Sequence, residues 1–83
     1  MTEGGRLHLM THPSDNVTTL LDDRGDIPVL LDGFQVSLGV CFGHKVALQP
    51  ISKGAPILKY QVVIGHATAD IKAGEHVHVH NCR

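Results

Sequence analysis

The sequence lacks the features that mark several large classes of protein. It has no tryptophan, two phenylalanines and one tyrosine, so few aromatic rings are available for stacking on nucleic-acid bases. Its basic residues are scattered and its formal net charge is −1, which gives no electrostatic footprint for nucleic acid. No long apolar run predicts a signal peptide or membrane span, and no basic amphipathic segment predicts a membrane-surface helix. We therefore expect a cytoplasmic protein with no nucleic-acid or membrane partner.

Cysteine is also scarce. Cys41 and Cys82 are the only two, and neither belongs to a C-x-x-C pair. One bridge between them stays open, but two free thiols in a reducing cytoplasm are the expectation. The 83 residues predict one small domain over 1–83, with residues 1–6 frayed. A chain of this size buries only about 60% of its unfolded surface, so a metal or a partner would help to stabilise it.

Short segments rich in β-branched residues alternate with glycine and proline turns, and no segment sustains a helical period of 3.6 residues. Asp32-Gly33 is a hairpin signal, and Pro28 suggests an edge strand. Gly65 indicates a bulge or a crowded backbone position. The chain is predicted to be mostly β, with at most one or two short helical turns and with strands over residues 6–12, 17–21, 27–31, 34–38, 45–49, 57–60 and 61–69.

The sequence contains an internal repeat. Residues 51–57 and 71–77 share the pattern Ile-x-x-Gly-x-x-(Ile/Val), and the two copies stand twenty residues apart. Each copy predicts an apolar residue, a tight turn at the glycine and a following strand. Two matched units suggest pseudo-symmetry.

Seven histidines are an excess in so short a chain, and three of them follow one pattern. His76, His78 and His80 alternate with two valines. In an extended strand their imidazoles would share one face, about 6.5 to 7 Å apart at the backbone. Two of them could then hold one metal ion or one anionic group. The alternative is an edge strand whose polar face happens to be histidine.

Four motifs occur in an order that resembles a known family: residues 12–17, 42–48, 59–67 and 71–81. The chain resembles the N-terminal SAF domain of the altronate dehydratase family, which includes galactarate dehydratases and the small subunit of sulfolactate sulfo-lyase. The resemblance covers nearly everything after about Leu7 and implies a SAF-type β-clip fold. Gln61 departs from the pattern, because a glycine often follows the Lys-Tyr pair.

Members of this family eliminate water from sugar acids, or sulfite from sulfolactate, commonly with a divalent metal such as Fe²⁺. In fused members a much larger domain follows. Since this chain stops after His80-Asn81 and two more residues, the resemblance implies the small (alpha) subunit of a two-component lyase. It would be inactive alone and would complete an active site for a small anionic 2-hydroxy acid on a separate large catalytic subunit, in a hetero-oligomer. A non-catalytic module that binds carbohydrate acids or a partner is the alternative, and a freestanding metal carrier is a third reading.

The resemblance and the chemistry of the residues together predict which residues form the active site. His44 is the predicted acid, base or ligand, and Lys45 is predicted to bind an anionic oxygen. A turn histidine bonded to backbone and a solvated lysine are the alternatives. The predicted substrate-binding residues are Asp15, Asn16, Gly43 and Asn81, although the first two could simply bond their own turn. The predicted metal ligands are His78 and His80, with His76 left outside the motif, and the metal can be held mainly by the large subunit.

Overall fold

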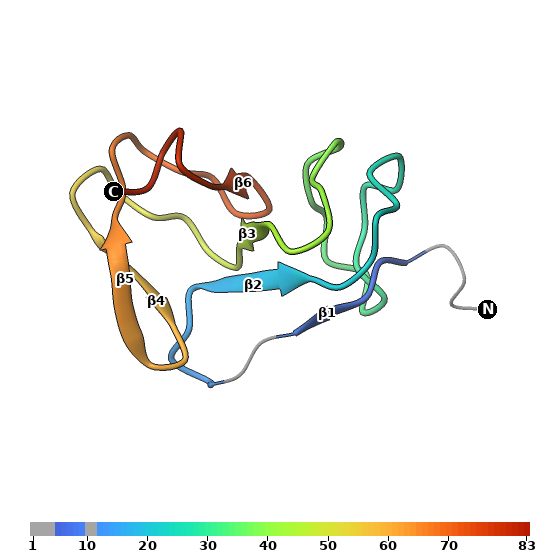
Figure 1. Cartoon of the computed structure of the whole chain (residues 1–83), viewed down its shortest axis with the longest axis horizontal. Coiled ribbons are helices and arrows are strands. Elements are labelled where there is room, and N and C mark those ends of the chain that lie inside the picture. The colour runs from blue at the N-terminus through green and yellow to red at the C-terminus, as the bar shows by residue number, and fades with distance from the viewer. Residues whose placement is uncertain (1–4, 10–11) are drawn as a thin grey trace.

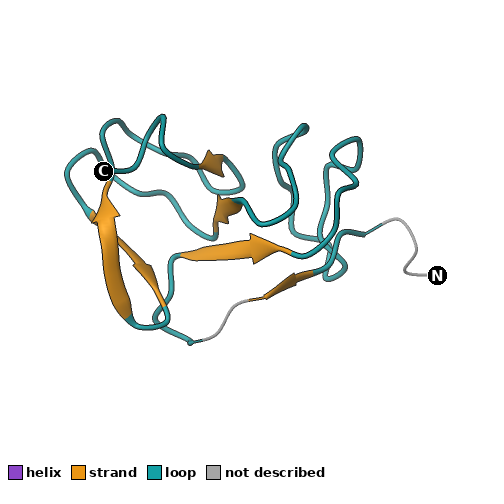
Figure 2. Ribbon diagram, viewed as in Figure 1, coloured by secondary structure: helices purple, strands orange, loops and turns teal. Residues whose placement is uncertain are grey.

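The computed structural model describes residues 5–9 and 12–83, and this part of the chain contains strands and turns but no helix. The expected mostly β fold class is confirmed. Within these residues, therefore, no helix could cross a membrane. The six strands, drawn in Figures 1 and 2, are β1 (His8–Leu9), β2 (Val17–Leu20), β3 (Lys45–Ala47), β4 (Pro56–Lys59), β5 (Val62–His66) and β6 (His76–Val77).

Four of the strands form an antiparallel sheet in the order β1-β2-β3-β6. Strand β2 lies inside this sheet, and its Val-Thr-Thr-Leu sequence has the β-branched residues that favour extended structure. Strands β4 and β5 form a separate antiparallel hairpin, which stands at the end of the molecule away from the N-terminus (Figure 1). The chain's C-terminal end lies beside β5, where the main chains of His66 and Arg83 exchange two hydrogen bonds.

Two expected strands are wrong. The chain does reverse at Asp32-Gly33, where the Gly33 N–H donates to the Leu30 carbonyl. However, residues 27–31 and 34–38 form only isolated bridges and no ladder. The reason is that the following backbone donors have other partners, because the Ser37 N–H donates to the Gly74 carbonyl across the fold. Strands β1, β2, β3, β5 and β6 are also shorter than expected, and residues 10–11 of the expected first strand lie outside the described residues.

The internal repeat corresponds to a pseudo-two-fold arrangement of backbone hydrogen bonds. Ile51 and Ile71, which begin the two copies, exchange their N–H···O bonds with each other at 2.8 and 2.7 Å. Each repeat glycine then donates 2.7 Å bonds to equivalent alanines, Gly54 to Ala67 and Gly74 to Ala47. Both glycines have a positive φ, as the tight turn predicts.

The pairing of strands follows the same symmetry. Val46 lies opposite His76 in β3 and β6, and twenty residues away His66 lies opposite Pro56 in β5 and β4. The strand that precedes each repeat copy therefore pairs with the strand at the end of the other copy in an equivalent register, β3 with β6 and β5 with β4. The two repeat copies are joined to each other through Ile51 and Ile71, so the two halves are intertwined. Gly65 occupies a crowded position, as expected, because a Cβ atom there would lie 2.6 Å from the Arg83 oxygen.

Two clusters of buried apolar residues form the core. One packs the repeat units together and contains Val17, Ala47, Ile51, Ile57, Ala67, Ile71 and Val77. The other lies towards the N-terminal half and contains Leu20, Leu30, Val36, Val40 and Val46. Strands β2 and β3 contribute to both clusters, so the central strands join the two halves of the core.

Arg6 is fully buried, which makes the expected fraying of residues 1–6 wrong at this position. Residues 1–4 lie outside the described residues. The Arg6 guanidinium donates to the Val40 carbonyl at 2.6 Å and to the Asp22 carboxylate at 2.8 Å. A buried charge needs such partners, and they fasten the start of the chain to the second core cluster.

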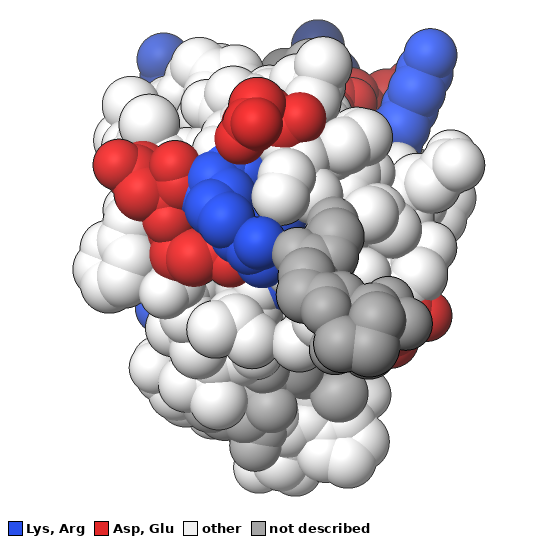
Figure 3. All heavy atoms as spheres, turned by 90° about the vertical axis from the view of Figure 1, so that its right-hand side faces the viewer, with Lys and Arg blue, Asp and Glu red and all other residues white. Residues whose placement is uncertain are grey.

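Opposite charges also lie together on the surface. Figure 3, which faces the right-hand side of Figure 1, shows basic side chains between acidic ones, and neither sign covers that face. Among the ion pairs of the described residues, the Arg24 guanidinium lies 3.5 Å from the Asp22 carboxylate. Burial raises the pKa of Asp22, but hydrogen bonds from the Leu7 N–H, Arg6 and the Arg24 N–H outweigh it and hold the pKa at about 2.

Asp22 is therefore expected to make folding stability depend on acidity. Its folded-state pKa lies below the ordinary 3.8, so its contribution is present above about pH 4 and is lost as the pH falls through 2. The loss should amount to about 2 kcal/mol, measured by urea unfolding across this range. Asp22→Asn should be destabilised at neutral pH and should lack this acid step, whereas Asp26→Asn, at an exposed position, should behave like the unaltered chain. Equal acid sensitivity in both variants would contradict the assignment.

Candidate metal centre

His44 is held at the start of β3 by a backbone turn. Gly43 adopts a φ of +82°, which favours glycine, and its N–H donates to the Leu20 carbonyl. The His44 N–H donates to the Cys41 carbonyl at 3.0 Å, and the His44 carbonyl accepts from the Leu20 N–H at 2.9 Å. The main chain on both sides of the imidazole is therefore fixed against β2.

The expected extended run over residues 76–80 is wrong beyond Val77. Strand β6 ends there, and the two valines do not share a face, because Val77 is fully buried while Val79 is 80% exposed. The cause lies in the partner strand. Val77 pairs with Lys45, the first residue of β3, so the next position of β6 has only the His44 turn opposite it and no strand to pair with.

Asn81 shapes the turn that replaces the strand. Its side-chain oxygen accepts from the His78 N–H at 3.0 Å, and its amide nitrogen donates to the His76 carbonyl at 2.8 Å. Asn81 is buried, so both bonds are shielded from water. The predicted substrate-binding role of Asn81 stays a prediction; in the structure its side chain fixes the loop that carries two histidines.

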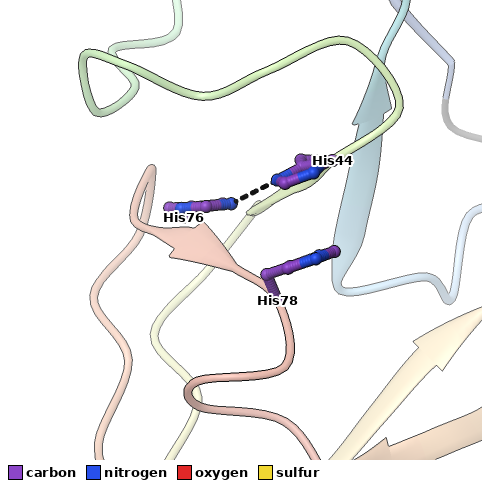
Figure 4. A group of neighbouring side chains, drawn as sticks. All are labelled: His44, His76 and His78. Carbon is purple, nitrogen blue, oxygen red and sulfur yellow. Dashed lines mark hydrogen bonds between the residues drawn. The ribbon is translucent and has the colours of Figure 1, made fainter.

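The turn before β3 and the segment formed by β6 and the loop after it bring three imidazoles together (Figure 4). His44 Nδ1 lies 2.9 Å from His76 Nε2, and one ring nitrogen from each of His44, His76 and His78 lies within 4.8 Å of the others. The His44 and His78 rings stack with centroids 3.8 Å apart and planes 10° from parallel. No carboxylate or thiol of the described chain joins these three residues in the group. All three side chains are half-buried.

The predicted ligands are therefore arranged in a way the sequence did not indicate. His78 belongs to the group, whereas His80 lies beside His76 with ring centroids 5.1 Å apart and is not one of its three members. His76, left out of the predicted ligands, is one of the three members of the cluster. Its alternation with His78 and His80 was the signal that could have nominated it.

The surroundings of His76 and His78 favour their neutral imidazole forms. Burial lowers the pKa of His76, and the neighbouring His80, His44 and His78 lower it further. The pKa of His78 is lowered for the same reasons, with Lys45 contributing. Burial and the nearby Lys59 ammonium also lower the pKa of Lys45. Neutral imidazole is the form that coordinates a metal, so the lowered pKa values of His76 and His78 favour metal binding.

The donor set fits a divalent transition metal. Imidazole nitrogens suit iron, zinc, copper and nickel, and they bind at about 2.0–2.1 Å. Two such ligands at a right angle would lie about 3 Å apart, which is close to the 2.9 Å between His44 Nδ1 and His76 Nε2. Three protein ligands would leave further coordination positions open to water or substrate, as in catalytic rather than structural sites.

Asp15 and Asn16 contact the β4–β5 hairpin. The Asp15 carboxylate accepts hydrogen bonds from the main-chain N–H groups of Tyr60 and Gln61, the two non-glycine residues of the described chain that have positive φ. The Asn16 side chain bonds the Pro56 carbonyl and the Leu58 N–H. Both side chains are buried in these contacts. Their predicted roles in substrate binding stay predictions, alongside this evident role in holding the hairpin.

The cysteines are both free, with Cys41 exposed and Cys82 half-buried. The described chain thus has no disulfide, and the reduced state of the two thiols stays a prediction.

Comparisons with known proteins agree with the family suggested by the motifs. The model of the altronate/galactarate dehydratase SAF domain matches residues 6–83. Altronate dehydratase of Escherichia coli is 46% identical over 92% of this chain, and that of Bacillus subtilis is 44% identical over 87%. The chain spans only 16% and 15% of those two proteins.

A relative of comparable length is also found. The (2R)-sulfolactate sulfo-lyase subunit alpha of Paracoccus pantotrophus is 37% identical, and the match covers 84% of this chain and 85% of that protein. Its name assigns it to an enzyme of more than one subunit.

The cluster should bind one divalent ion through His44, His76 and His78. We expect alanine at any of the three to weaken Co²⁺ binding at least about tenfold, because partners that only orient a ligand are already worth that much. His80→Ala should have a smaller effect, and His66→Ala, at an exposed position on β5, should have none. The visible spectrum of bound Co²⁺ measures both affinity and geometry. A larger loss in His80→Ala than in His76→Ala would favour the pair expected from the sequence.

Asn81 should control how well the cluster is formed. Asn81→Ala removes both side-chain bonds of the loop, and leaving those buried backbone groups unpaired should cost about 1–3 kcal/mol. Co²⁺ affinity should fall by about tenfold or more even where the variant remains folded. Asn81→Asp keeps the acceptor for the His78 N–H but loses the donor to His76, so it should restore binding only in part. Unchanged Co²⁺ affinity in a folded Asn81→Ala chain would show that the loop does not need this clamp.

Proposed function

Because the chain belongs to the altronate/galactarate dehydratase SAF domain family, we propose that it is the small subunit of a two-component lyase. In this role it completes an active site on a separate large catalytic subunit. The relative of comparable length supports this, since it is named a subunit alpha and is covered over 85% of its length. A cytoplasmic location belongs to the same proposal.

The proposed reaction is elimination from a small anionic 2-hydroxy acid. A base takes the proton from the carbon that carries the hydroxyl, the electron pair forms a double bond to the next carbon, and that carbon releases hydroxide or sulfite. The resulting enol gains a proton to become a 2-keto acid. Dehydration and sulfite elimination share this sequence and differ in the leaving group. Both need a group that stabilises the charge developing on the carboxylate.

The observation that carries the proposal is the convergence of His44, from the turn before β3, with His76 of β6 and His78 of the loop after it. These three residues would hold the metal, for which Fe²⁺ is the first candidate. A divalent metal bound there would act as a Lewis acid towards the oxygens of the substrate. The cavity that His78 lines would give the substrate room beside the metal, and stacking of the three rings holds their nitrogens in place beforehand.

Other residues of the chain would bind and position. Lys45 follows His44 directly, is half-buried and forms no ion pair within the described residues, so its ammonium group is available to an anionic oxygen. His80 lies beside His76 at the exposed edge of the cluster, where it can hold or release a proton. Asn81 positions His76 and His78 through the backbone. The remaining acid-base groups are assigned to the large subunit.

The proposal can be tested by isolating a tagged version of the chain from its own cells. We expect a large partner in fixed ratio with one divalent metal per complex, and turnover of altronate, galactarate or (2R)-sulfolactate measured as 2-keto acid formed. The isolated chain should be inactive. His44→Ala should retain the partner but lose turnover, while His66→Ala should retain both.

Three results would count against the lyase subunit. These are turnover by the chain alone, full activity of the His44→Ala complex, and a chain that co-purifies with no partner. Binding of carbohydrate acids without turnover would instead favour the non-catalytic module.

A further inference from the structure

We propose that a cavity beside the three histidines is a seat for a short 2-hydroxy acid that carries two negative charges. The proposal rests on the function proposed above and narrows its substrate class. It favours a short, doubly charged acid over a long polyhydroxy sugar acid. Three properties of the cavity support this proposal: its position, the charge of its side chains and the lack of serine, threonine, asparagine and glutamine in its lining.

The cavity lies directly beside the histidine cluster. The cavity has a volume of about 260 Å³ and is lined by Lys45, Ile64, His78, Val79, Cys82 and Arg83. His78 is thus shared between the cavity and the group that could hold a metal. A small acid in the cavity would have one end at the cluster and the rest between the loop after β6 and strand β5.

The charged side chains that line the cavity are positive. Lys45 and Arg83 are both cationic, and no aspartate or glutamate lines the cavity. Neither residue forms a salt bridge with a carboxylate in the described part of the chain. The main-chain bonds between Arg83 and His66, at 2.7 and 2.9 Å, fix the backbone at this wall. Two cations around one small space favour a ligand with two anionic groups.

The rest of the lining selects against additional hydroxyl groups. Apart from the charged residues and His78, the walls are Ile64, Val79 and the Cys82 thiol, and no serine, threonine, asparagine or glutamine is present. A hydroxyl of a sugar acid that faces Ile64 or Val79 would lose water without gaining a side-chain hydrogen bond, which is unfavourable. A three- or four-carbon acid would place only carbon against these walls.

Two other cavities in the described chain differ in this respect. One, of about 290 Å³, is lined by residues that include Gln35, Ser37 and Glu75, and the other, of about 340 Å³, includes Ser52 and Asp70. Each therefore has an acidic residue and uncharged polar groups, and none of the three clustered histidines lines either one. The combination of two cations, an apolar wall and a clustered histidine occurs only beside His78 among these three.

Titration of the metal-free, ¹⁵N-labelled chain with three acids at constant ionic strength tests the seat by NMR. Malate is short and doubly charged, lactate is short and singly charged, and galactarate is doubly charged with additional hydroxyls. Malate should give saturable shifts at the amides of Lys45, Ile64 and Val79. Lactate should bind about fivefold more weakly, for the loss of one charge pair. Galactarate should bind about tenfold more weakly or worse, because the apolar wall offers its hydroxyls no partner.

Matched variants locate the effect. Lys45→Met and Arg83→Met should each weaken malate binding and reduce its advantage over lactate, while Lys45→Arg should keep most of it. Lys72→Met removes an equal charge at the other two cavities and should change nothing. A dispersed spectrum checks the fold of each variant. Galactarate binding as tightly as malate, equal losses in Lys45→Met and Lys72→Met, or shifts confined to other regions would overturn the proposal.

Because these titrations need neither metal nor partner, their outcome is separate from that of the lyase assay. A complex that turns over a sugar acid best would keep the proposed function and reject this seat. Malate binding at the cavity in a chain that supports no elimination would reject the lyase role and keep the anion site.

Discussion

The pairing of β3 with β6 is the interaction on which the candidate centre depends. Two residue pairs, Lys45 with Val77 and Val46 with His76, set the register between segments about thirty residues apart. That register puts the turn before β3 beside the loop after β6, and each of these segments carries histidine. A shift of one residue would exchange the faces of β6, burying His76 and exposing Val77. The buried position of Val77 in the core therefore fixes the imidazoles as well.

Much of the fold followed from local sequence patterns. The β-branched run of β2, the glycine turns of the repeat and the crowded position of Gly65 all agree with the structure. Period-2 alternation nevertheless says nothing about where a partner strand ends. The strand predicted over residues 76–80 was therefore too long, because β3 has no residue that could pair with the chain beyond Val77. The same limit explains the missing ladder between residues 27–31 and 34–38.

Features that depend on distant contacts were the ones that the sequence could not predict. Arg6 looked like part of a frayed terminus, because its partners Asp22 and Val40 are far along the chain. His76 was left outside the site for the same reason, since its proximity to His44 requires the strand register. Asp15 and Asn16 were predicted to bind substrate or to bond their own turn. In the structure their side-chain oxygens accept hydrogen bonds from the hairpin, more than forty residues away.

The pseudo-two-fold arrangement also shows that the two halves have diverged in chemistry while keeping their backbone. The positions twenty residues away from His76, His78 and His44 are Pro56, Leu58 and Ile64. One end of the intertwined pair thus carries nitrogen donors where the other carries only carbon side chains. Two identical copies of one such unit could make the same reciprocal hydrogen bonds as a homodimer and would then possess two equivalent sites. Fusion into one chain removes that requirement for identity, so one end is free to specialise in ligand chemistry while its counterpart serves packing.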